Sequence, residues 1–172
     1  MKSLFALLLF ISTNLFSQDK IENLKINWPE KYAWKIGNNQ ENDKIHFVEL
    51  VPGNEDINNW TIIGTMLSIK GITNLPMDTA VNLMYEQTKA NAPKATVTII
   101  EKNETDSNHW VIFKIESPSF NDSNTPESQL YYIVQGKSSL YSNFVALKQK
   151  KLSDEFVKEW IDVFKKSELI YQ

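Results

Sequence analysis

The side chains that could transfer protons or attack a substrate are few and scattered in this sequence. The two histidines, His46 and His109, are far apart and belong to no HExxH pattern or other spacing typical of zinc ligands. No GxSxG pentapeptide announces a serine nucleophile, and the chain contains no cysteine. The histidines are therefore interpreted as ordinary surface or half-buried residues, and no residue is assigned a catalytic role.

Carboxylates are the remaining candidates for catalysis, because glycoside hydrolysis needs only two of them on either side of the scissile bond. Glu49, Glu101, Asp106 and Glu116 have the required type. Their spacing in the sequence does not bring any two of them together. A carboxylate-dependent hydrolase acting on envelope or environmental polymers is therefore kept as an alternative hypothesis.

Binding loops for cofactors and metals are also missing from the sequence. The five glycines form neither GxGxxG nor GxxxxGK[ST], the usual cradles for phosphate groups. The polar stretch from Gly37 to Asp43 does not have the ligand spacing of an EF-hand calcium loop. It is predicted to be a flexible polar loop, and no cofactor and no metal site are expected.

The most unusual local feature is the segment from Glu49 to Thr61, which allows two interpretations. In the structural one, Pro52 and Gly53 turn the chain and Trp60 packs under the next strand. In the functional one, Trp60 forms the floor of a pocket for a sugar or peptide. Its polar selectors would then be Glu49 and Asn59. The candidate ligand-binding residues are thus Glu49, Pro52, Gly53, Asn59 and Trp60.

The elements that must position these residues are indicated by hydrophobic periodicity. Alternating or apolar runs predict six strands, at Lys44 to Val51, Thr61 to Ile72, Thr96 to Glu101, His109 to Glu116, Gln129 to Gln135 and Ser138 to Lys148. The polar stretch from Phe120 to Ser128 is predicted to be a loop. The short Gly136-Lys137 link favours a tight hairpin and therefore antiparallel neighbours.

Two stretches have helical spacing instead. Apolar residues between Pro76 and Asn91 recur at intervals of three and four, and Pro93 follows the predicted helix. A second helix begins at Ser153, a good N-cap, with acidic residues in its first turn and lysines in its last. The predicted fold class is α+β, with an antiparallel sheet of about six strands covered by a central and a C-terminal helix.

The first seventeen residues are predicted to be a secretory signal peptide. Lys2 precedes a short apolar run from Leu4 to Ile11, and Ser17 is a small residue at the expected cleavage site. The run is too short to cross a bilayer, so no stable membrane anchor is expected after cleavage. Removal of residues 1–17 from the 172-residue chain leaves 155, which suits a single globular domain at 18–172. We therefore expect an exported protein, either periplasmic or secreted.

Composition narrows the range of partners. All eighteen basic residues are lysines, and they alternate with acids rather than forming a basic stripe. Because arginine is the preferred side chain for phosphate and guanine recognition, a nucleic-acid partner is not expected. The absence of cysteine excludes disulfides and a lipid-modified cysteine. Loss of Lys2 with the signal peptide changes the formal charge from −3 to −4.

Several of these motifs together resemble a group of small exported bacterial proteins of unknown function. The resemblance rests on Val51-Pro52-Gly53, on Asn59-Trp60-Thr61 and on the Leu152-Ser153-Asp154-Glu155 helix start with Trp160. The order of predicted elements is also similar to the Mog1/PsbP-like α/β/α sandwich. This resemblance implies binding or assembly roles, and no catalytic residue is carried over from it.

The favoured hypothesis is an exported, non-enzymatic binding or accessory module of the bacterial envelope, acting on an envelope protein or a small ligand. The hydrolase described above is the first alternative. The second alternative is an envelope immunity or inhibitor protein, for which the acidic charge would suit a basic toxin partner.

Overall fold

The structure of the chain is a computed structural model that describes residues 21–120 and 125–172. The predicted signal peptide, residues 1–17, lies outside these described residues.

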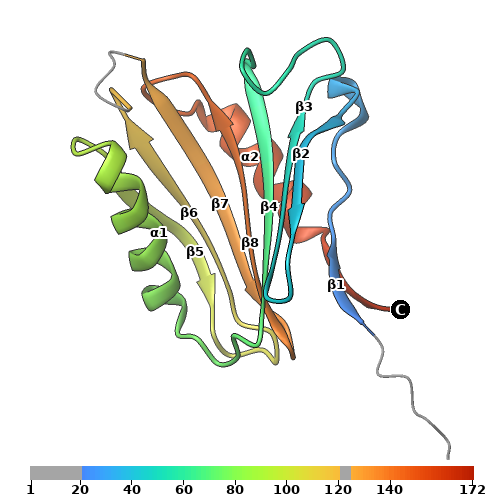
Figure 1. Cartoon of the computed structure of the whole chain (residues 1–172). Helices are drawn as coiled ribbons and strands as arrows, with labels where there is room; N and C mark the ends of the chain where they lie inside the picture. Colours follow the sequence, from blue (N-terminus) through green and yellow to red (C-terminus); the bar gives the residue numbers. More distant parts are fainter. Residues whose placement is uncertain (1–20, 121–124) are drawn as a thin grey trace, which may run out of the picture.

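Most of the chain is built into one antiparallel sheet with the strand order β2-β3-β4-β8-β7-β6-β5 (Figure 1). These strands are β2 (Lys35–Glu41), β3 (Ile45–Val51), β4 (Ile62–Lys70), β5 (Thr96–Asn103), β6 (Trp110–Ser117), β7 (Glu127–Gln135) and β8 (Ser139–Leu147). The helices are α1 (Met77–Asn91) and α2 (Asp154–Lys165), and a short 3₁₀ turn, η1 (Glu30–Tyr32), precedes β2. The predicted mixed α+β class, the six predicted strands and both predicted helices are confirmed, with ends shifted by one or two residues.

The predicted count of about six strands is corrected to seven, because β2 occupies most of the stretch that was predicted to be a loop. Its sequence, KIGNNQE, has no alternation of apolar residues, and all its side chains except Asn38 are exposed. The strand is held by main-chain pairing with β3, which is interrupted by a register shift between Ile36 and Asn38. A strand without a buried face gives no periodic signal, so hydrophobic patterning could not detect it.

The two ends of the described chain form a second, two-stranded antiparallel sheet from β1 (Glu22–Lys25) and β9 (Glu168–Tyr171). The Glu22 carboxylate fixes this sheet to the β7–β8 turn. It accepts hydrogen bonds from the main-chain N–H of Lys137 at 2.7 Å and of Ser138 at 3.1 Å. The Tyr171 hydroxyl donates a further bond at 3.1 Å. Burial raises the pKa of Glu22, but these hydrogen bonds outweigh it and hold the pKa below its ordinary value.

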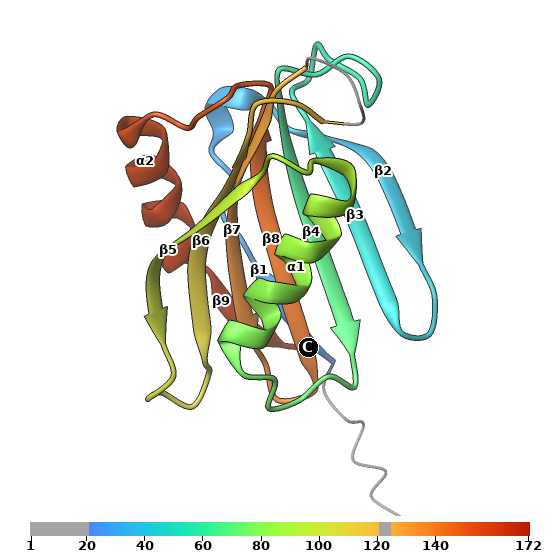
Figure 2. The same ribbon diagram turned by 90° about the vertical axis from the view of Figure 1, so that its left-hand side faces the viewer.

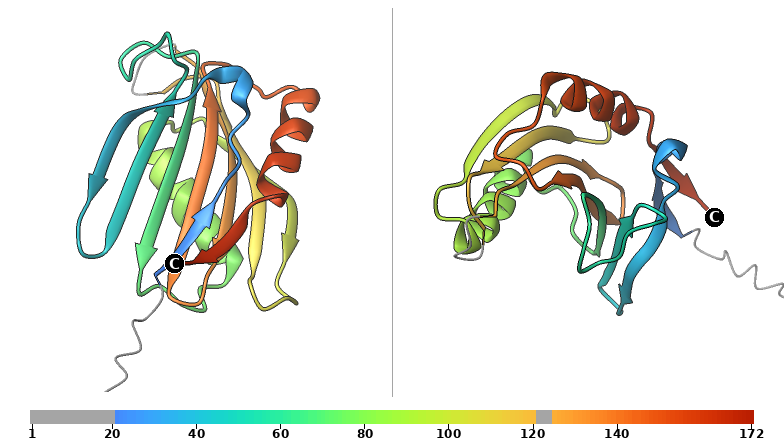
Figure 3. Two further views of the ribbon diagram at one scale, coloured as in Figure 1. Left: turned by 90° about the vertical axis from the view of Figure 1, so that its right-hand side faces the viewer. Right: turned by 90° about the horizontal axis from the view of Figure 1, so that it is seen from above.

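The large sheet is curved, and the two helices lie on opposite faces of it (Figures 2 and 3). The view from above in Figure 3 shows α1 inside the curve and α2 outside it, with β1 and β9 on the same side as α2. Consecutive residues of each strand therefore serve different cores. Tyr131 belongs to the α1 core and Tyr132 to the α2 core, as the alternation of β7 predicts.

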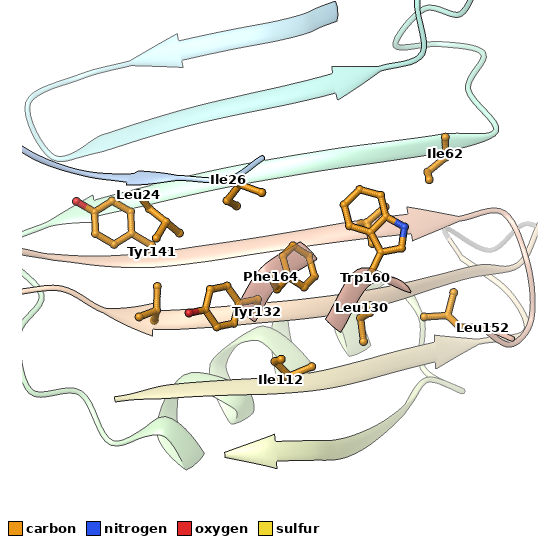
Figure 4. Packing of buried hydrophobic residues seen from close by; sticks show 12 residues of the cluster. Leu24, Ile26, Ile62, Ile112, Leu130, Tyr132, Tyr141, Leu152, Trp160 and Phe164 are labelled. Carbon is orange, nitrogen blue, oxygen red and sulfur yellow. The ribbon is translucent and has the colours of Figure 1, made fainter. Parts of the chain in front are cut away.

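The α2 core is centred on Trp160 and Phe164, which are both fully buried (Figure 4). Ser153 caps the helix as predicted, with its Oγ accepting a bond of 3.2 Å from the Phe156 N–H. Trp28 extends this core across the sheet and packs directly on Gly64. A Cβ atom at Gly64 would overlap with the indole ring, so only glycine fits beneath it.

The α1 core covers only part of the inner face of the large sheet. Buried residues of α1, such as Met77 and Ala80, pack on side chains from β6, β7 and β8. No residue of β3 or β4 is part of this cluster. Part of the inner face thus remains available for a site.

Candidate functional site

The predicted site residues lie close together in the chain but point to different surroundings. Pro52 is buried, and the N–H of Gly53 donates a bond of 3.4 Å to the carbonyl of Tyr32. Asn59 is exposed, and its N–H bonds to the carboxylate of Asp56 at 3.0 Å. Trp60 is half-buried against a small core of Val51, Ile63 and Ala146, as the structural interpretation of this segment predicts.

Glu49 differs from the other four because it lies on the inner face of the sheet. Its side chain is half-buried, and its Oε2 atom accepts a hydrogen bond of 3.0 Å from the Asn38 amide on β2. In the sheet register, Glu49 pairs with Thr65 of β4. The structure therefore places Glu49 beside a different set of residues from those that the sequence suggested.

The other carboxylates singled out in the sequence have structural partners. Glu101 forms an ion pair with Lys165 at 2.6 Å, and Glu116 pairs with Lys114 at 3.1 Å. Asp106 accepts a bond of 2.7 Å from the amide of Asn103. Glu101 and Glu116 lie on β5 and β6 and Asp106 lies in the loop between them, and β4, β8 and β7 separate these strands from β3 in the sheet order, so the three do not form a two-carboxylate site with Glu49.

The clearest cavity on the inner face is a pocket of about 210 Å³ beside the C-terminal half of α1, which we call the α1 groove. It is lined by Phe47, Thr65, Leu67, Met84, Gln87, Thr88, Asn91, Phe120, Gln129, Tyr131, Ser142 and Phe144. Apolar side chains from β3, β4 and α1 form its walls. Hydroxyl and amide groups lie among them, which is the usual composition of a small-molecule site.

The floor of the α1 groove contains a buried hydroxyl that lacks a hydrogen-bond partner. Thr65 is only 2 % exposed, and its Oγ1 atom has no partner among the residues that the structure describes. The neighbouring floor hydroxyl, that of Ser142, donates to the Met84 sulfur at 3.6 Å. A buried hydroxyl without a hydrogen-bond partner lowers the stability of the folded state by about 1–3 kcal/mol. A bound ligand that forms a hydrogen bond with the Thr65 hydroxyl would remove this cost.

A chain of hydrogen bonds runs from α1 through the groove to the start of β7. The Thr88 hydroxyl bonds to the Tyr131 hydroxyl, which in turn donates to Gln129 Oε1 at 3.0 Å. Gln129 Nε2 then donates to Glu127 Oε1 at 2.7 Å. Burial raises the pKa of Tyr131, so this hydroxyl keeps its proton and acts as a donor. The network fixes three polar side chains of the groove, those of Thr88, Tyr131 and Gln129, before any ligand binds.

Three charges lie at the end of the network. Burial raises the pKa of Glu127, and the charge of Glu49 raises it further, while Gln129 and Lys148 act in the opposite direction. Lys148 is exposed, and its Nζ lies 4.6 Å from the centroid of the Trp60 ring. Two half-buried carboxylates thus face one solvent-screened lysine.

Glu127 is the functional candidate that sequence reasoning missed. It was placed in the polar stretch from Phe120 to Ser128 that was predicted to be a loop, but it is the first residue of β7. The residue alternation of β7 could have indicated its position, since Glu127 lies on the same strand face as Gln129 and Tyr131. Extending the predicted strand by two residues would have placed it on the inner face.

A larger depression of about 600 Å³ lies beside β9, where Trp110, Tyr132 and Tyr171 contribute aromatic surface. Several of its polar groups are already engaged within the protein. Asn108 donates to the carbonyl of Gln135 at 2.9 Å, and Asp106 accepts from Asn103. The α1 groove, with its unsatisfied hydroxyl, is therefore the stronger candidate.

Comparison with known proteins gives no assignment, because no protein-family model and no curated protein matches the chain. In the described ranges, no helix is both long and apolar enough to cross a membrane.

Proposed function

We propose that this protein is an exported, non-enzymatic module of the bacterial envelope that binds a small ligand in the α1 groove. The observation that carries the proposal is the buried Thr65 hydroxyl, which lines the groove without a hydrogen-bond partner among the described residues. The groove volume, about 210 Å³, has room for about seven water molecules at about 30 Å³ each. A ligand of similar size, with an apolar body and one polar end, matches the lining.

The finer fold assignment belongs to the same proposal. Two helices on opposite faces of an antiparallel sheet support a Mog1/PsbP-like sandwich, a fold whose resemblance implies binding or assembly. Export is supported by the signal-peptide pattern in residues 1–17.

The test uses three probes with the same six-carbon body, n-hexanol, n-hexylammonium and hexanoate. Binding is measured by ligand-detected NMR on the purified protein. Gln87 is exposed on α1 and lines the groove, so Gln87→Trp should fill the groove without disturbing the core. Glu86→Trp places the same indole on an exposed α1 position that does not line the groove, and it serves as the matched control.

We expect at least one probe to bind the wild-type protein and the Glu86→Trp variant, and to lose most of its affinity for Gln87→Trp. Equal binding to both tryptophan variants would show that the probes bind elsewhere. Absence of binding by all three probes would reject the groove as a small-ligand site.

The second candidate function is the carboxylate-dependent hydrolase, which is favoured by one observation. Glu127 has a raised pKa, as a general acid requires, and the charge of Glu49 contributes to it. Incubation with soluble peptidoglycan fragments, followed by a reducing-end assay, separates the two functions. The binding module predicts no release of reducing ends. Release that is abolished by both Glu127→Gln and Glu49→Gln would replace the proposal with the hydrolase.

A further inference from the structure

The charges around the α1 groove indicate which chemical class of ligand it would bind. Glu49 and Glu127 are half-buried near one end of it, where the sheet register places Glu49 opposite the floor residue Thr65. Gln129 connects Glu127 to the groove through a bond of 2.7 Å. Glu127 is thus hydrogen-bonded to a residue that lines the groove, and Glu49 is the strand partner of another.

The C-terminal end of α1 adds to this negative end. Gln87, Thr88 and Asn91 of its last turns line the groove, and Figure 2 shows that this end of α1 lies at the same end of the sheet as the β3–β4 loop. The C-terminus of a helix carries a partial negative charge and favours cations nearby. Amide oxygens from Gln87 and Asn91 are additional acceptors.

Two lysines oppose this negative potential, but neither lines the groove. Lys148 is exposed and lies over the Trp60 ring. Lys89, in the last turn of α1, is exposed and lies over the Tyr85 ring at 5.4 Å. Because solvent screens exposed charges more strongly than half-buried ones, the carboxylates and the helix terminus dominate the potential at this end.

From this arrangement, we infer that the α1 groove selects a small organic cation, an ammonium group carried on an apolar body. The inference rests on the proposed function. The apolar body would lie against Leu67 and Met84, which line the walls. The ammonium N–H groups would donate to the free Thr65 hydroxyl oxygen and to carboxylate oxygens at the Glu127 end.

The experiment compares dissociation constants of n-hexylammonium, n-hexanol and hexanoate, which differ only in the charge of the head group. We expect n-hexylammonium to bind about tenfold more tightly than n-hexanol, since charge-assisted hydrogen bonds are roughly twice as strong as neutral ones. Hexanoate should bind most weakly.

Three variants connect the selectivity to the groove. Glu127→Gln keeps the side-chain shape and the acceptor oxygen for Gln129 but removes the charge, so it should reduce the n-hexylammonium affinity about fivefold and leave n-hexanol unchanged. Lys148→Met removes an opposing charge and should raise the n-hexylammonium affinity. Glu86→Gln removes an exposed α1 carboxylate outside the groove and should change neither.

The outcomes separate this inference from the proposed function. Equal affinity for the three probes, or a preference for hexanoate, overturns the cation selectivity while the groove remains a binding site. Selectivity that persists unchanged in Glu127→Gln and Lys148→Met also overturns it. Failure of all three probes to bind overturns both proposals.

Discussion

Individual carboxylates in this protein have opposite effects on folding, and their surroundings explain the difference. Glu22 accepts hydrogen bonds from two main-chain N–H groups and from side-chain hydroxyls, so its charged form is stabilised. Glu127 is half-buried near another carboxylate, so its charged form is disfavoured. Folding lowers the pKa of Glu22 and raises the pKa of Glu127.

Substitution of Glu22 by glutamine should lower the free energy of unfolding by about 1 kcal/mol at neutral pH, after allowance for solvent screening. A lowered pKa contributes stability above the unfolded value, about 4.3, and this contribution is lost as the pH falls through the folded value. Urea unfolding from pH 7 to pH 3 should therefore show the difference between wild type and variant shrinking below about pH 4.5. Tyr171→Phe removes one of the donors and should cost less. A difference independent of pH would contradict this role.

Glu127→Gln should have the opposite effect on the free energy of unfolding. An acid whose pKa is raised by folding opposes folding when it ionises, so the wild-type protein loses stability as the pH rises through the raised value. The variant should be more stable than wild type at pH 7, and the two should converge below about pH 4, where both forms are neutral. The same urea series measures this, with Glu86→Gln as the exposed control. Destabilisation at pH 7 would mean that the ionised carboxylate has a favourable partner.

Among the elements, β4 connects the two cores because its residues alternate between faces. Gly64 lies beneath Trp28 on the α2 side, and Thr65 lies in the α1 groove on the other side. Any change that shifts β4 away from Trp28 would also move the groove floor. The packing of one face therefore sets the geometry of the other.

Gly64→Ala should lower the free energy of unfolding by about 1–3 kcal/mol, because the added methyl group would overlap with the indole ring of Trp28. Gly37→Ala is the matched control, because a Cβ there meets Val51 at an ordinary distance of 3.4 Å and should change stability by less than about 1 kcal/mol. Thermal unfolding by circular dichroism compares the two. Equal stability of both alanine variants would contradict the packing of Trp28 on β4.

How far the sequence predicted these elements depends on whether they bury an apolar face. Strands such as β4, and the capped helix α2, were predicted because alternation and the Ser153 cap are local signals. β2 was missed because its apolar residues do not alternate and all its side chains except that of Asn38 are exposed. β1 and β9 were missed because each has four residues and pairs with the opposite end of the chain.

The candidate site was predicted only in part, since its residues come together through the sheet order. Glu49, which the sequence singled out, is the strand partner of the groove residue Thr65, but Thr65, Gln129 and Met84 come from three other elements that meet only in the folded sheet. No local sequence pattern indicates that these residues lie together in the folded protein. Pro52, Gly53 and Asn59 were suggested by a conspicuous turn, and that turn serves the packing of the loop.

At the scale of the whole molecule, the proposal requires that the protein leaves the cytoplasm. Residues 1–17 fused to alkaline phosphatase, which is active only after export, should give activity outside the cytoplasm. Substitution of Leu7 and Leu8 by aspartate would break the apolar run and should abolish that activity. A reporter that stays inactive with the unmodified leader would contradict the proposed compartment.

The central claim is that the α1 groove, and not another depression, binds the ligand. Titration of the isotope-labelled protein with n-hexylammonium, followed by chemical-shift mapping, tests it most directly. We predict that the largest shifts lie at Thr65, Met84 and Gln129, which line the groove. Shifts centred instead on Trp110 and Tyr171, which line the depression beside β9, would contradict the claim.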